Sequence, residues 1–141
     1  MKKIIIINGP NLNLLGKREP EIYGNRSFAG YFEELKNNFP GIQLDCYQTN
    51  HEGSIIDKLQ EADAVYDGII LNAAAYTHTS IAIGDCIKAI DIPVVEVHIS
   101  DINKRETYRQ NSYISEGAVK VIMGEGLKGY KTGIKFLLSI L

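Results

Sequence analysis

The sequence predicts an α/β protein in which helices cover both faces of a five-stranded parallel sheet. Two observations predict this fold class: short, apolar, β-branched runs alternate with helical patterns, and a helical pattern follows each apolar run. The chain has 141 residues, and no linker, repeat or low-complexity tract divides it. Because this length suits one domain, residues 1–141 are expected to form a single domain.

The elements follow one another in a regular order. The first apolar run, 3–8, follows a basic start as a signal peptide would, but it is shorter than the roughly 7–15 apolar residues of such a segment, so a buried strand is expected. Further strands are expected at 42–48, 68–72, 92–98 and 119–123. Helices are expected at about 27–38, 54–64, 79–90 and 127–140, with a short one near 104–111.

Five strands that are each followed by a helix suggest a flavodoxin-like, doubly wound sheet with the spatial order 2-1-3-4-5. In such sheets ligands bind beyond the carboxyl ends of the strands, at the switch point between the first and third strands. The residues of interest are therefore those that follow Asn8, Leu71 and Val97.

Composition excludes several function classes. Lys plus Arg is 15 and Asp plus Glu is 17, a net charge of −2 that gives no footprint for nucleic acid or an anionic membrane. No apolar run approaches the roughly 20 residues of a membrane span. Cys46 and Cys86 have no paired spacing, and the histidines have no metal-ligand spacing, so neither a metal nor a disulfide is expected. No phosphate-binding glycine motif occurs, so no cofactor is expected, and a reducing cytoplasm fits the cysteine usage.

The segment 8–24 after the first strand is longer than the usual strand-to-helix connection and carries Arg18 and Tyr23. Long loops in compact domains are often lids or binding loops. A surface loop with solvated side chains would explain the same residues, and the pattern alone leaves both interpretations open.

The third strand is followed by Asn72 and His78, which bracket a turn in the predicted crevice. Backbone N–H groups at the start of a helix favour anions there, while Thr77 or Thr79 is expected to cap that helix. Asp85 lies seven residues beyond His78 and is expected on the same helical face. An ordinary helix start and a solvated aspartate would account for these residues equally well.

The fourth strand is apolar except for Glu96 and His98, whose alternation places them on one face. Burying an unpaired carboxylate costs several kcal/mol, so Glu96 is expected to pair with His98. A satisfied structural pair is one interpretation. The other interpretation is that Glu96 orients His98 and keeps it basic for acid–base chemistry. This second interpretation is favoured because the pair lies at the carboxyl end of a central strand.

Arg105 and Arg109 are expected four residues apart on the short helix, where like charges repel mildly. A solvated helix face is one explanation of this pair. An anionic ligand or a tyrosinate that offsets the repulsion is the other.

Several blocks of the sequence are together similar to the type II 3-dehydroquinate dehydratases, in the family's order from end to end. These blocks are GPNLNLLG at 9–16, REP at 18–20, YG at 23–24, NHEG at 50–53, AYTHTS at 75–80, EVHIS at 96–100, and Arg105 through Arg109 into SYIS at 112–115.

The resemblance implies dehydration of 3-dehydroquinate to 3-dehydroshikimate, a step towards the aromatic amino acids, through an enolate and without an imine. By resemblance, Tyr23 is the base that removes a C2 proton, and Arg18 supports its deprotonation. His98 is the proton donor to the departing C1 hydroxyl and is held by Glu96. Asn11 matches a position near the enolate, acting through a water molecule.

The resemblance also implies a substrate-binding set and a homododecamer built from trimers. Arg105 matches a position near the loop tyrosine, and the position of Asp85 reaches across a trimer interface. The substrate-binding positions are Asn72, His78, Asp85 and Arg109, with the Ile99–Ser100 backbone as a cradle for the substrate carboxylate.

The chain departs from the family's pattern at two places. Ala73-Ala74 stands where the family usually has Pro-Gly, in the turn that presents Asn72, and Asp101 replaces a usual Asn near the carboxylate cradle. Both departures bear on substrate affinity, and neither removes a catalytic group.

Two other functions compete with this one. A flavodoxin-like module that binds a flavin or a phosphorylated ligand would explain the fold but not Glu96 beside His98, nor Arg18 beside Tyr23. The second alternative is a catalytically inactive relative that is retained as a structural oligomer. The presence of every motif residue argues against it.

Overall fold

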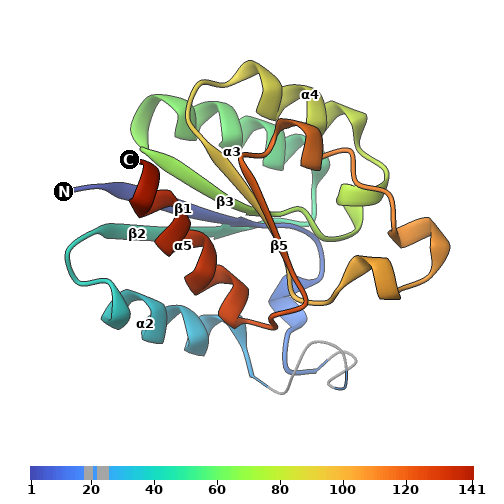
Figure 1. Ribbon diagram of the computed structural model, residues 1–141, viewed down its shortest axis with the longest axis horizontal. Coiled ribbons are helices and arrows are strands. Elements are labelled where there is room, and N and C mark those ends of the chain that lie inside the picture. The colour runs from blue at the N-terminus through green and yellow to red at the C-terminus, as the bar shows by residue number, and fades with distance from the viewer. Residues whose placement is uncertain (18–20, 22–25) are drawn as a thin grey trace.

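Five strands form one parallel sheet with the order β2-β1-β3-β4-β5 in the computed structural model, which describes residues 1–17, 21 and 26–141 (Figure 1). The predicted doubly wound topology is therefore confirmed. The strands are β1 (Lys3–Asn8), β2 (Gln43–Gln48), β3 (Gly68–Asn72), β4 (Val94–His98) and β5 (Lys120–Met123). The α-helices are α2 (Phe28–Asn38), α3 (Glu52–Val65), α4 (Ile81–Ala89) and α5 (Lys128–Ile140).

Helices cover both faces of the sheet because its central strands are apolar on both sides. In β1, Ile4 and Ile6 pack with α2 and α5, while Ile5 and Ile7 pack with α3 and α4. Figure 1 shows these two helix pairs on opposite faces of the sheet. The alternation of side chains along a strand thus divides one apolar run between two cores.

The sheet order brings the carboxyl ends of β1 and β3 together. β1 pairs with β2 on one side and with β3 on the other, and Asn8 lies opposite Asn72 in the β1–β3 register. The connections after β1 and β3 therefore leave the sheet beside each other. This is the edge at which the sequence predicts a ligand.

Two predicted helices differ in the structure. The predicted helix 79–90 is α4 alone, because a separate 3₁₀ turn (Ala74–His78) precedes it and Ser80 caps it. His78 and Asp85 therefore do not share a helical face. The predicted short helix 104–111 consists of two 3₁₀ turns, Ile102–Lys104 and Thr107–Arg109.

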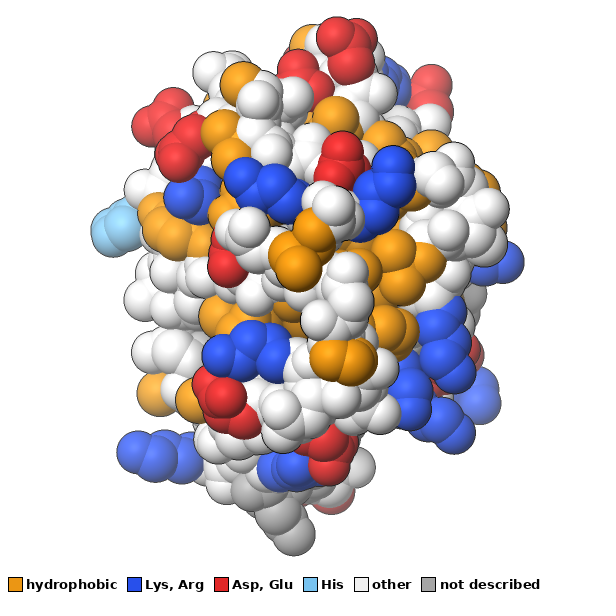
Figure 2. Space-filling model, turned by 90° about the vertical axis from the view of Figure 1, so that its left-hand side faces the viewer, with side chains coloured by type: hydrophobic (Ala, Val, Ile, Leu, Met, Phe, Trp, Pro, Cys, Tyr) orange, Lys and Arg blue, Asp and Glu red, His pale blue; other side chains and the backbone are white. Residues whose placement is uncertain are grey.

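The surface carries both signs of charge. Figure 2 shows the face on which the two termini lie, where Lys and Arg side chains are interspersed with Asp and Glu side chains and with apolar groups. Among the described residues, no helix has the length and apolar character that a membrane span requires.

Candidate active site

A cleft opens at the carboxyl ends of β1, β3 and β4. Its walls come from the segments that follow these three strands, so residues far apart in the sequence face one space. Eight residues singled out in the sequence line it: Asn11, Asn72, His78, His98, Ile99, Ser100, Arg105 and Arg109.

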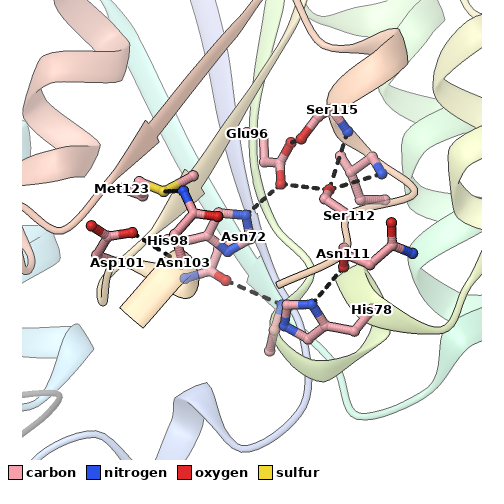
Figure 3. A network of polar contacts seen from close by, with 12 residues as sticks. Asn72, His78, Glu96, His98, Asp101, Asn103, Asn111, Ser112, Ser115 and Met123 are labelled. Carbon is pink, nitrogen blue, oxygen red and sulfur yellow. Dashed lines mark hydrogen bonds and ion pairs between the residues drawn. The ribbon is translucent and has the colours of Figure 1, made fainter. Parts of the chain in front are cut away.

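The wall formed by β4 carries a buried acid–base pair. Glu96 is 1% exposed and His98 is 5% exposed, and His98 Nε2 forms a hydrogen bond with a carboxylate oxygen of Glu96. Burial raises the pKa of Glu96, but His98 and the hydroxyls of Ser115 and Ser112 outweigh it and hold that pKa below its usual value. The expected pairing of Glu96 with His98 is confirmed, and the carboxylate is anionic (Figure 3).

His78 stands beside His98 in the cleft. The two rings stack with their centroids 6.5 Å apart, and His78 Nδ1 lies 2.8 Å from the backbone carbonyl of Asn111. Because a carbonyl only accepts, Nδ1 carries the hydrogen and Nε2 can accept one from a ligand. Burial lowers the pKa of His78, so this ring is neutral at neutral pH.

Asn72 is held by a buried hydrogen-bond network that joins the ends of β1 and β3 to α5. Its amide Nδ2 donates to the Tyr130 hydroxyl at 2.9 Å, and that hydroxyl donates to Asn8 Oδ1 at 2.8 Å. All three residues are almost wholly inaccessible to solvent. The sequence pattern of Tyr130 indicates only packing at the last strand-to-helix turn. Its hydrogen bond joins residues 122 positions apart, a separation over which the sequence carries no local signal.

The Ala73-Ala74 departure leaves the turn after β3 intact at a local cost. The backbone N–H of Ala74 donates to Asn72 Oδ1 at 3.1 Å, which orients the Asn72 side chain. Ala74 has a φ of 52°, in the left-handed region that favours glycine. The neighbouring peptide packs closely, since a Cβ on Gly9 would lie 2.6 Å from the Ala73 carbonyl oxygen.

Two arginines give the cleft positive charge. Arg105 Nη1 donates to the Ser100 hydroxyl at 3.2 Å, and Arg109 Nε lies 2.8 Å from a carboxylate oxygen of Glu106. The carbonyls of Ile99 and Ser100 accept from amides of the turn before α5, which fixes this backbone against the cleft. Arg105 follows the first 3₁₀ turn and Arg109 ends the second, but both line the same cleft.

Asn11 enters the cleft from the segment after β1. Its φ is 69°, and its backbone N–H donates to Asn50 Oδ1 at 3.1 Å. Asparagine tolerates this left-handed conformation better than most residues, which fits its place in the turn. Asn50 is therefore a supporting residue that the sequence indicates only as part of a matching block.

One predicted site residue lies away from the cleft, and two others cannot be placed relative to it. Asp85 is exposed on α4 and lines a second, shallow hollow with Ile81 and Tyr113. Arg18 and Tyr23 lie outside the described residues. In the part of the chain that the structure describes, no group of three or more His, Cys, Asp or Glu side chains is arranged to hold a metal ion.

Comparisons with known proteins agree with this geometry. The family model described as Dehydroquinase class II matches residues 2–138. A 3-dehydroquinate dehydratase of Clostridium botulinum (strain Hall) is 50% identical, covering 99% of this chain and 96% of its own length. A catabolic 3-dehydroquinase of Verticillium alfalfae is 47% identical, covering 95% and 91%.

A solved structure is similar over nearly the whole chain. The crystal structure of a type II dehydroquinase from Butyrivibrio crossotus has a TM-score of 0.94 and 45% sequence identity, and the match covers 97% of each chain. The chain belongs to the class II dehydroquinase family.

Proposed function

We propose that this protein is a type II 3-dehydroquinate dehydratase of the shikimate pathway, which removes water from its substrate through an enolate intermediate. The observation that carries the proposal is the buried Glu96–His98 pair in a cleft lined by Asn72 and two arginines. Membership of the dehydroquinase family supports the choice of substrate.

The reaction needs a base for the first proton. In our proposal the Tyr23 phenolate takes a proton from C2, beside the ketone, and the electron pair left behind forms an enolate. A phenol has an unperturbed pKa of about 10, too high for a base at neutral pH, and a nearby guanidinium favours its anion. Arg18 supplies that charge, with Arg105 as a second source in the cleft wall.

The enolate then collapses, forms the C1–C2 double bond and expels the C1 hydroxyl, which takes a proton and leaves as water. His98 is the donor of that proton. Because its Nε2 is occupied by Glu96, Nδ1 is the nitrogen that serves the cleft. The Glu96 carboxylate holds the ring in place for this donation.

The rest of the cleft binds and orients the substrate. The Ile99–Ser100 backbone and Arg109 receive the substrate carboxylate, while Asn72 and the neutral His78 bind its hydroxyl groups. Asn11 lies near the enolate oxygen and acts through a water molecule. Asp85 serves the cleft of a neighbouring subunit in a homododecamer built from trimers.

The decisive experiment compares wild type with Tyr23→Phe on 3-dehydroquinate, following the near-ultraviolet absorbance of the conjugated enone product. Because a general base contributes typically about 10²–10⁴-fold, kcat should fall by that factor in the variant. Tyr66→Phe is the matched control, since that hydroxyl binds Asp45 away from the cleft.

Two outcomes would refute the proposal. If Tyr23→Phe turned over substrate at the wild-type rate, Tyr23 could not be the base. No enone from wild type at any enzyme concentration would favour an inactive or ligand-binding relative, and a coloured purified protein would favour a flavin-binding module.

An imine route is disfavoured because no lysine is among the described residues that line the cleft. Borohydride added with substrate should therefore leave the protein unmodified. A mass increase by the reduced substrate would contradict the enolate scheme.

A further inference from the structure

We propose that Ser112 and Ser115 are positioning residues that hold the Glu96 carboxylate, and through it the His98 imidazole, in the orientation needed for proton donation. The inference rests on the proposed function, because that function makes His98 the acid. Neither serine is among the residues that line the cleft, so both act through Glu96. Figure 3 shows them on the far side of Glu96 from His98.

The strands on either side of β4 offer Glu96 no polar support. Its partners on the two neighbouring strands are Leu71 and Val121, both apolar. A buried anion is costly unless it is hydrogen-bonded, so support beyond the bond to His98 must come from outside the sheet. The Ser112 hydroxyl donates to Glu96 Oε2 at 2.8 Å, and the Ser115 hydroxyl donates to Oε1 at 2.6 Å.

The two serine hydroxyls therefore hold both carboxylate oxygens of Glu96, which fixes the orientation of the carboxylate plane. Oε2 is shared between Ser112 and His98, while Oε1 is held by Ser115. Since Glu96 is the group that fixes the His98 ring, the direction of His98 Nδ1 depends on these two hydroxyls.

Ser112 has its hydrogen committed to Glu96. Its oxygen accepts the backbone N–H groups of Ile114 at 3.1 Å and Ser115 at 3.2 Å. A hydroxyl has one hydrogen, and amides only donate, so that hydrogen goes to the carboxylate. The Ser112 hydroxyl thus donates to Glu96, and its oxygen also accepts the two backbone amides that stabilise the turn.

The serine-bearing segment is anchored independently of Glu96. Tyr113 N–H donates to the Thr77 carbonyl at 2.9 Å, and Ile114 is fully buried. The segment also packs closely on α4, where a Cβ on Gly84 would lie 2.4 Å from the Tyr113 carbonyl oxygen. Two hydroxyls on so constrained a backbone form a preorganised clamp for the carboxylate.

The charges that surround Glu96 set the expected pH behaviour. His98 contacts it, His78 stacks on His98, and Arg109 lies in the same cleft as His98, while the residues paired with Glu96 on the adjacent strands are apolar. Burial raises the pKa of Glu96, and the serine hydroxyls help to lower it. Removing either hydroxyl should therefore move the acid limb of activity to higher pH.

The test compares Ser115→Ala, Ser112→Ala and the double variant with wild type across pH. Because hydrogen bonds to charged groups are the stronger class, kcat should fall about tenfold in each single variant and about a hundredfold in the double, with KM within about twofold. Ser115→Thr keeps a hydroxyl and should restore kcat. Ser139→Ala is the control, since that hydroxyl donates to the Phe136 carbonyl within α5.

A second measurement needs no turnover and separates this inference from the proposed function. The ¹³C shift of the Glu96 carboxyl, followed by NMR, should show the acid midpoint of the Glu96–His98 pair at higher pH in Ser115→Ala than in wild type. Ser112→Ala also loses the acceptor of two turn amides, so Ser115→Ala is the deciding variant. A wild-type midpoint in Ser115→Ala, or a wild-type kcat with an unshifted acid limb, would overturn the assignment.

Discussion

At the scale of single residues, Ala74 illustrates how the chain tolerates local strain to present Asn72. Its φ of 52° costs an alanine about 1–2 kcal/mol relative to the right-handed region, whereas glycine adopts it freely. The turn keeps its hydrogen bond from Ala74 N–H to Asn72 despite this cost.

Ala74→Gly should therefore stabilise the protein by about 1 kcal/mol, after allowance for the greater freedom of glycine in the unfolded chain. The midpoint of urea unfolding measures the effect. Ala75→Gly is the matched control, because Ala75 has no positive φ and should lose stability instead. A lower midpoint for Ala74→Gly would contradict the strain argument.

Glu96 should make stability depend on pH. Its pKa in the folded protein lies below the unfolded value of 4.5, so its contribution is fully present above that value and is lost as pH falls through the folded pKa. Between about pH 6 and pH 3, wild type should lose more unfolding free energy than Glu96→Gln. Equal losses in the two proteins, measured by urea unfolding, would refute this.

The sequence predicts the Glu96–His98 pair because both parts of the inference are local: strand alternation sets the shared face, and the cost of a buried charge demands a partner. The clamp of Ser112 and Ser115, and the bridge through Tyr130, were not predictable in this way. They depend on chain segments that meet only after the sheet has formed.

At the scale of elements, the start of α4 shows which hydroxyl caps a helix. The sequence favours Thr77 or Thr79, but the capping group is Ser80, which is 2% exposed and accepts from Ile83 N–H at 2.9 Å. The preceding 3₁₀ turn ends at His78, so the cap falls later than the sequence pattern indicates.

Ser80→Ala should therefore destabilise the protein by about 1 kcal/mol, as the loss of an N-cap typically does. Thr79→Ala, at an exposed neighbouring position, is the control and should change little. Thermal unfolding of both variants measures the difference. Equal effects would indicate that the Ser80 hydroxyl is not the cap.

The prediction of a helix at 104–111 was wrong for a related reason. Four-residue spacing of Arg105 and Arg109 is compatible with one helical turn, but it is equally compatible with two 3₁₀ turns. Asp101, one of the departures from the family's pattern, caps the first of these turns by accepting from Asn103 N–H at 3.0 Å. Short segments are decided by such local hydrogen bonds and not by periodicity.

At the scale of the whole molecule, the strand order was predictable because alternation of strands and helices leaves few topologies. That order places the ends of β1, β3 and β4 around one cleft, so the position of the site followed from the fold. The oligomeric state does not follow from the fold in this way, because the structure of one chain shows its surface but not the subunits that contact it.

We expect twelve copies of the 15.7 kDa chain, about 188 kDa, in sedimentation analysis. Ile81, which is 58% exposed beside Asp85 in the shallow hollow, should lie in the trimer interface. Ile81→Asp should give smaller species and lose turnover together, because our proposal has Asp85 serve the cleft of a neighbouring subunit. Val65→Asp, on α3 outside this hollow, is the control. A fully assembled, fully active Ile81→Asp protein would exclude this interface.

The bridge from Asn72 through Tyr130 to Asn8 also constrains the order of events during biosynthesis. The two strand-end amides emerge from the ribosome long before residue 130, and until then the hydroxyl that joins them does not exist. A nascent chain that has completed β4 contains Glu96 and His98 but lacks the hydroxyl that fastens Asn72. The buried fastening of the two strand ends is therefore completed late, when α5 docks on the sheet.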